Sequence, residues 1–161
     1  MQISKAMADL MNAQVGNELG ASNQYVQIAS YFDGESLSKL AKFFYDQAEE
    51  EREHAMKFVH FLMEVGADLS IPSIPATKTD VGTAEKAFEM SLAWEQEVTG
   101  QINAMMDLAI QEKDYASQAF LQWFITEQVE EISTMESMLD VVRKAGEKNV
   151  LMVEAYLIHR E

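Results

Sequence analysis

The stretch Ala48-Glu49-Glu50-Glu51-Arg52-Glu53-His54 decides the fold, because it places ionisable groups inside an apolar helical pattern. Glu51 and His54 lie three residues apart, so on a helix they share one face, about one turn from each other. Apolar residues recur at helical spacing around them: Leu37, Leu40, Ala41, Phe44, Ala48, Ala55, Phe58, Phe61, Leu62 and Val65. A carboxylate and an imidazole therefore point into a core, where an uncompensated charge is costly. The rest of the chain must supply the compensation.

The composition predicts one folded helical domain over residues 1–161, with 48% apolar residues, 2 Pro and 7 Gly. A net charge of −15 argues against nucleic acid and anionic lipid as partners and leaves cations as natural ligands. The lack of cysteine excludes disulfides, thiolate metal sites and a cysteine nucleophile. We find neither a signal-peptide pattern nor a run of eighteen apolar residues, so we expect a soluble, cytoplasmic protein.

Apolar spacing predicts four long helices and one short one. We expect them at about residues 4–32, 37–65, 84–111, 115–145 and 150–159. Asp33-Gly34 is a turn dipeptide, Ser36 and Thr83 are candidate N-caps, and Gly66 marks a helix end. Residues 67–82 hold both prolines and no helical pattern, and at about 3.3 Å per residue they could span a long helix. The sequence therefore predicts an all-α four-helix bundle over residues 4–145, with one long crossover connection.

The two halves of the chain fall into register when the sequence is shifted by 77 residues. The polar residues that interrupt the apolar stripes are repeated: a Glu, then Glu or Gln thirty-three positions on, then His or Glu three positions further. Similarity elsewhere is low, which indicates two helix pairs related by a pseudo-twofold axis and not a tandem array. Such an axis would bring six residues together in the middle of the bundle: Glu18, Glu51, His54, Glu95, Gln128 and Glu131.

This mirrored set favours a site for two divalent cations. Four buried carboxylates cannot all ionise side by side without cations, and two divalent ions balance their four negative charges. Oxygen-rich ligands with one imidazole suit Fe, Mn or, less well, Zn, and argue against copper and structural zinc. Each residue alone is a weak signal: Glu-x-x-His is common by chance, and Tyr25 by itself is more typical of a core tyrosine. The repetition at mirrored spacing carries the prediction.

In these residues the chain resembles a known protein family, the ferritins, and within them the bacterial and archaeal non-heme ferritins. The resemblance covers nearly the whole chain. Its most specific segments are Asn17-Glu18-Leu19 with Tyr25, the run from Gln47 to His54, Glu95, and the run from Asp114 through Phe120-Leu121-Gln122-Trp123-Phe124 to Glu131. It implies a ferritin-like four-helix bundle with one long crossover and a short fifth helix at residues 150–159.

The resemblance also implies a role for each matching residue. Glu18 and His54 look like terminal ligands of one iron, and Glu51 like the bridge between two. Glu95 and Glu131 look like ligands of the second iron, with Gln128 close by. Three further carboxylates match a third, neighbouring iron site: Glu50, Glu127 and Glu130. Tyr25 matches a tyrosine that hydrogen-bonds near the site and can donate an electron.

Two departures narrow the subfamily. Bacterioferritins look symmetric, with Glu-x-x-His in both halves, whereas Gln128 and Glu131 occupy those positions in the second half here. Bacterioferritins also bind heme through a Met directly after the bridging Glu, and this chain has Arg52 at that position. We therefore predict a non-heme protein.

The function that the resemblance implies is iron storage. Fe(II) would be oxidised by O2 or peroxide and kept as ferric oxyhydroxide inside a homo-oligomeric shell of 24 subunits, with residues 150–159 packed about the fourfold axes. One rival is a di-iron oxidase or peroxidase on the same bundle that stores nothing. Another is an acidic helical interaction protein without metal.

Overall fold

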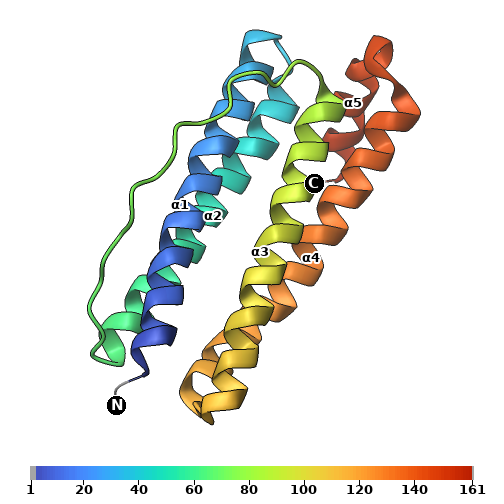
Figure 1. Ribbon diagram of the computed structural model, residues 1–161. Helices are drawn as coiled ribbons and strands as arrows, with labels where there is room; N and C mark the ends of the chain where they lie inside the picture. The colour runs from blue at the N-terminus through green and yellow to red at the C-terminus, as the bar shows by residue number, and fades with distance from the viewer. Residues whose placement is uncertain (1–2, 161) are drawn as a thin grey trace.

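The computed structural model describes residues 3–160, which contain helices and no strand (Figure 1). Four long helices form the bundle: α1 (Lys5–Gly34), α2 (Ser38–Glu64), α3 (Ala84–Glu112) and α4 (Tyr115–Ala145). α1 pairs with α2, and α3 pairs with α4. The connection from α2 to α3 runs the length of the bundle along α1, as a crossover (Figure 1). The fold predicted from the sequence is thus confirmed.

Side-chain caps explain where three of the helices begin. The Ser4 hydroxyl accepts a hydrogen bond from the Met7 N–H, the Thr83 hydroxyl accepts one from Lys86, and the Asp114 carboxylate accepts one from Ser117. Each cap satisfies a backbone donor that the first turn of a helix leaves unpaired. Thr83 was predicted as a cap, and this prediction is confirmed.

The first turn of the chain differs from the prediction. α1 continues through Asp33-Gly34, and the turn falls at Glu35 and Ser36. Ser36 adopts a left-handed backbone conformation (φ 61°), so it cannot serve as the N-cap of α2. Leu37 takes that position and has no side chain able to cap. The dipeptide signal was therefore two residues early, because Asp33 and Gly34 are also compatible with the final turn of α1.

A carboxylate from the far end of the chain caps α2 instead. Glu154 lies in α5 (Val150–Arg160), which follows the short 3-10 helix η1 (Glu147–Asn149). Its two oxygens accept hydrogen bonds from the N–H groups of Lys39 at 2.9 Å and Leu40 at 2.7 Å. An anion at a helix N-terminus is also favoured by the helix dipole. Glu154 thus fixes α5 against the bundle.

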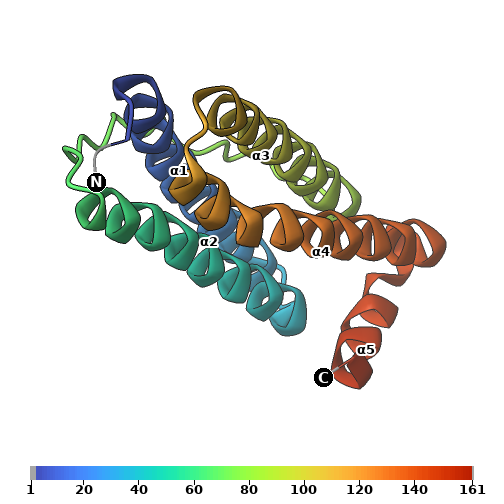
Figure 2. The same ribbon diagram turned by 90° about the horizontal axis from the view of Figure 1, so that it is seen from below.

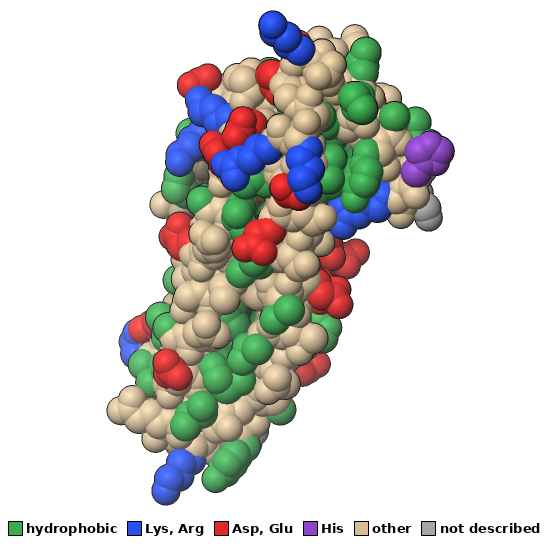
Figure 3. Space-filling view, turned by 90° about the vertical axis from the view of Figure 1, so that its right-hand side faces the viewer, with side chains coloured by type: hydrophobic (Ala, Val, Ile, Leu, Met, Phe, Trp, Pro, Cys, Tyr) green, Lys and Arg blue, Asp and Glu red, His purple; other side chains and the backbone are tan. Residues whose placement is uncertain are grey.

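One face of α5 is buried and the other is exposed. Val153 and Leu157 join the core, while Leu151 and Met152 are 70% and 65% exposed. α5 leaves the end of the bundle at an angle (Figure 2). Hydrophobic side chains gather on this side, at the upper end of the surface in Figure 3.

Among residues 3–160, every helix is too short or too polar to span a membrane.

The crossover is held on α1 by two side-chain amides that imitate backbone pairing. Asn12 donates to the carbonyl of Asp68 at 2.9 Å and accepts from the N–H of Ser70 at 2.6 Å. Gln24 donates to the carbonyl of Lys78 at 2.9 Å and accepts from its N–H at 2.8 Å. Both ends of the extended segment are therefore tied to the same helix.

Between these two amides, glycines on α1 let the crossover approach closely. A Cβ atom at Gly16 would lie 2.4 Å from Cγ of Pro72, and one at Gly20 would lie 3.6 Å from Ile74. Together with Asn12 and Gln24 these glycines recur every four residues, which places them in one stripe along the helix. This stripe is the surface of α1 on which the crossover packs.

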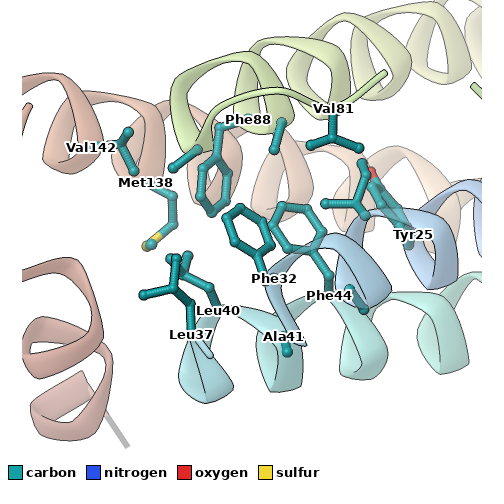
Figure 4. Packing of buried hydrophobic residues seen from close by; sticks show 14 of the residues in the cluster. Tyr25, Phe32, Leu37, Leu40, Ala41, Phe44, Val81, Phe88, Met138 and Val142 are labelled. Atoms are coloured by element: carbon teal, nitrogen blue, oxygen red, sulfur yellow. The ribbon is translucent and has the colours of Figure 1, made fainter. Parts of the chain in front are cut away.

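The apolar core is divided into two clusters with polar residues between them. Figure 4 shows the first, in which Phe32, Phe44 and Phe88 pack together near the α1–α2 turn. The second surrounds Phe58 and Phe124 towards the other end of the bundle. On each long helix the two clusters are separated by one interval, and the polar residues of the mirrored set occupy it.

Candidate metal centre

All six residues of the mirrored set are buried at this middle level. Glu18, Glu51 and Glu95 are each 1% exposed, and the remaining three are 3 to 4% exposed: His54, Gln128 and Glu131. Each long helix contributes at least one of them. Burying this many ionisable groups together is unfavourable unless they are protonated, paired or bound to cations.

The ligand atoms form two groups that share Glu51. Glu18, Glu51 and His54 offer atoms that lie within 4.8 Å of one another, and so do Glu51, Glu95 and Glu131. In the first group Nδ1 of His54 is 3.4 Å from Oε2 of Glu51. The repeat predicted that these six residues meet, and the resemblance implied that Glu51 is shared between two cations, which stays a prediction.

Neighbouring donors orient the carboxylates from behind. Tyr25 donates from its hydroxyl to Oε1 of Glu95 at 2.5 Å, and Gln128 donates to Oε2 of the same carboxylate at 3.2 Å. Gln128 also lies 3.2 Å from the backbone carbonyl of Glu95. These contacts fix the rotation of the Glu95 carboxylate before any ion arrives.

Two buried carboxylate oxygens have no hydrogen-bond partner within residues 3–160. They are Oε2 of Glu18 and Oε1 of Glu51, which belong to the same group of ligand atoms. A buried acceptor left without a donor is destabilising, because it has lost its hydration. A divalent cation between these oxygens would remove that cost, so the donor set fits hard or borderline metal ions such as Fe(II).

Burial raises the pKa of every carboxyl in the centre. The pKa values of Glu18 and Glu51 lie well above the usual 4.5, mainly because of desolvation and then because each faces another carboxylate. The pKa of Glu95 is also raised by burial, and that of Glu131 is raised to about 8. Burial also raises the pKa of the Tyr25 hydroxyl, so it remains a donor. Burial therefore favours the protonated form of each of these carboxyls when no cation is bound.

A third group lies beside the first two. Glu50, His54, Glu127 and Glu131 offer ligand atoms within 4.8 Å of one another. Glu50 is half-buried, and desolvation raises its pKa. Glu130 has an exposed side chain and is not in this group. The structure thus brings Glu50 and Glu127 next to the centre and leaves Glu130 on the surface, while a third iron site stays a prediction.

Two glutamines that sequence reasoning did not assign to the site complete it. Gln14 donates to Oε1 of Glu18 at 2.8 Å, and Gln47 donates to Oε2 of Glu131 at 3.0 Å. Both are buried. A signal was available, since each glutamine stands four residues before a buried glutamate, Glu18 or Glu51, and therefore on the same helical face. Gln47 nevertheless reaches across to another helix, which spacing alone does not reveal.

Comparison with known proteins identifies the class. The family model for the ferritin-like domain matches residues 8–145. The chain therefore belongs to the ferritin family.

Individual relatives agree with this assignment. The chain is 35% identical over 159 residues to a bacterial non-heme ferritin of Staphylococcus aureus, covering 99% of this chain and 94% of the relative. It is 39% identical over 137 residues to ferritin BfrB of Mycobacterium tuberculosis, covering 85% and 76% of the two chains. An open-pore ferritin from the archaeon Archaeoglobus fulgidus superimposes with a TM-score of 0.93 at 32% identity, covering 97% of this chain and 98% of that one. The resemblance to prokaryotic non-heme ferritins is thus confirmed.

Proposed function

We propose that this protein is an iron-storage ferritin whose bundle interior oxidises Fe(II). The observation that carries the proposal is the pair of ligand groups joined by Glu51, with an unpartnered oxygen on Glu51 and another on Glu18. Membership of the ferritin family supports iron storage. Iron is the substrate and the cargo, and two Fe(II) ions fill the two groups.

Each side chain has a distinct part in binding the pair. Glu18 and His54 bind the first Fe(II) as terminal ligands, and Glu51 bridges. Glu95 and Glu131 bind the second, with Gln128 beside it. The hydrogen bonds from Tyr25 and Gln14 hold two of these carboxylates in place, so little rearrangement is needed on binding.

Protonation of the carboxyls in the centre is coupled to the binding of Fe(II). The pKa values of the carboxyls are raised, so any proton that a carboxyl holds before iron arrives is released when Fe(II) binds to it. With O2 as acceptor, two Fe(II) ions lose one electron each and O2 takes up two protons to give H2O2. With H2O2 as acceptor, the same two electrons and two protons give two molecules of water. The released protons and the consumed protons partly offset each other.

Storage requires an assembly. We propose a cytoplasmic homo-oligomeric shell of 24 subunits, in which ferric oxyhydroxide collects. The exposed apolar face of α5 supports this, because a face with Leu151 and Met152 largely uncovered is typical of a surface that another subunit covers. Glu50 and Glu127, with Glu130 at the surface, would form a third iron site beside the pair. Arg52 follows the bridging residue, so we expect no heme.

Stopped-flow absorbance after anaerobic Fe(II) loading and mixing with O2 tests the site. We expect Glu51→Ala and His54→Ala to slow the initial oxidation strongly, and Glu112→Ala, an exposed carboxylate at the end of α3, to leave it unchanged. Oxidation as fast as wild type in both site variants would overturn the assignment. Native mass spectrometry and electron micrographs test storage: a small oligomer without a mineral core would favour a di-iron oxidase or peroxidase instead.

A further inference from the structure

A second feature lies next to the metal centre and takes no part in iron binding. A half-enclosed pocket of about 240 Å³ lies between α1, the first half of α3 and the end of the crossover. Its apolar wall includes Ile28 and Met90, and its aromatic wall consists of Tyr25 and Trp94. Lys78, Ala93 and Glu97 are exposed and form its mouth.

The pocket touches the metal centre through one residue. Tyr25 lines the pocket with its side chain 2% exposed, and its hydroxyl donates to Glu95 at 2.5 Å. Glu95 belongs to the second ligand group. A molecule in the pocket is therefore separated from the Glu95 carboxylate by one aromatic ring and one hydrogen bond.

The lining favours a planar aromatic ligand with an anionic group. Tyr25 and Trp94 form an aromatic wall against which a ring system can pack, and Ile28 and Met90 add apolar surface beside it. The Trp94 indole Nε1 is buried and donates to no acceptor within residues 3–160. Lys78 and Glu97 both stand at the mouth, and of these two side chains the Lys78 ammonium is the one that can meet an anion.

We propose that this pocket binds small, planar, anionic aromatic reductants and passes their electrons to ferric iron in the centre. The inference rests on the proposed function, because stored Fe(III) is insoluble and its release requires reduction. The ligand loses two electrons and two protons as its ring is oxidised. The electrons cross Tyr25 and reduce two Fe(III) ions to Fe(II), and the protons leave through the pocket mouth to solvent.

Reduced flavin mononucleotide is a suitable probe, since it is planar, aromatic, anionic and a two-electron donor. The assembled protein is loaded with Fe(II), oxidised, made anaerobic and mixed with increasing amounts of the probe, and a ferrous chelator reports Fe(II). We expect the rate to saturate. Ala93→Trp, which fills the mouth, abolishes saturation, whereas Ala104→Trp, at another exposed position of α3, behaves as wild type. Lys78→Gln raises the half-saturating concentration about fivefold, the scale of one surface ion pair, with the maximal rate unchanged.

Two further measurements separate the pocket from the rest of the function. Dithionite is too small to need the pocket, so its rate should be equal in all four proteins. Oxidised flavin mononucleotide should bind metal-free wild type and the Ala104→Trp variant with quenching of its fluorescence, and should not bind Ala93→Trp. A non-saturating rate in wild type, or equal binding by the two tryptophan variants, overturns the inference. Failure of wild type to oxidise Fe(II) overturns the proposed function instead, and the binding measurement does not depend on it.

Discussion

Replacing Glu131 by Gln should stabilise the metal-free protein at neutral pH. Glu131 is buried, and its pKa is raised from 4.5 to about 8, first by desolvation and then by the charge of Glu95. A carboxyl with a raised pKa must be protonated to stay in the fold, whereas the unfolded chain ionises freely. The penalty is absent below pH 4.5, grows as the pH rises through the interval to about 8, and is constant above it. Gln carries no proton to lose and can still accept the hydrogen bond from Gln47.

The magnitude follows from the pKa difference. Between pH 4.5 and pH 7 the unfolded state gains stability relative to the folded state by about 1.36 kcal/mol per unit, so the penalty at pH 7 is about 3 kcal/mol. At pH 5 the penalty is less than about 1 kcal/mol. Glu131→Gln should therefore be more stable than wild type by these amounts, and the difference should widen with pH.

Urea unfolding of chelator-treated protein, followed by circular dichroism at pH 5 and pH 7, measures this difference. Glu130→Gln is the matched control, because it removes the same charge from the next residue, whose side chain is exposed. An excess stability of Glu131→Gln that is zero, or that does not change between the two pH values, would refute the reasoning. Added Fe(II) under anaerobic conditions should reverse the order, since wild type then gains more binding free energy.

Three further substitutions and one control test how the fold is held together. Gly16→Ala should destabilise the protein by about 1–3 kcal/mol in thermal unfolding, because its Cβ would meet Pro72 at 2.4 Å. Gly100→Ala is the control: its Cβ would meet open space, so it should stabilise the protein by up to about 1 kcal/mol. Glu154→Ala should cost about 1 kcal/mol and speed hydrogen exchange at the Lys39 and Leu40 amides, because it removes the carboxylate to which both donate. Unchanged exchange would contradict the capping role. Asn12→Ala should selectively raise proteolysis and hydrogen exchange of residues 68–70. Equal protection in wild type and variant would contradict the role of Asn12 in holding the crossover on α1.

The helices and the level of the site could be predicted because both depend on local spacing. An apolar stripe interrupted by Glu18 or Glu51 is visible in the chain itself, and the repeat of 77 residues indicated that the interruptions meet. The turn after α1 was misplaced because Asp33-Gly34 is also compatible with a final helical turn. Ser36 was misassigned as a cap because its backbone conformation depends on how α2 is placed.

The sequence by itself determined the all-α class, the four long helices, the crossover and the six polar residues of the centre, because helical periodicity relates residues only a few positions apart. Only the tertiary structure decided which carboxylate oxygens are free and which are held. Gln47 meets Glu131 across 84 residues, and Glu154 caps α2 across 115. Such contacts depend on side-chain direction after the helices have packed, and spacing within one helix carries no information about them. The same holds for the pocket beside Tyr25, which exists only because α1, α3 and the crossover converge there.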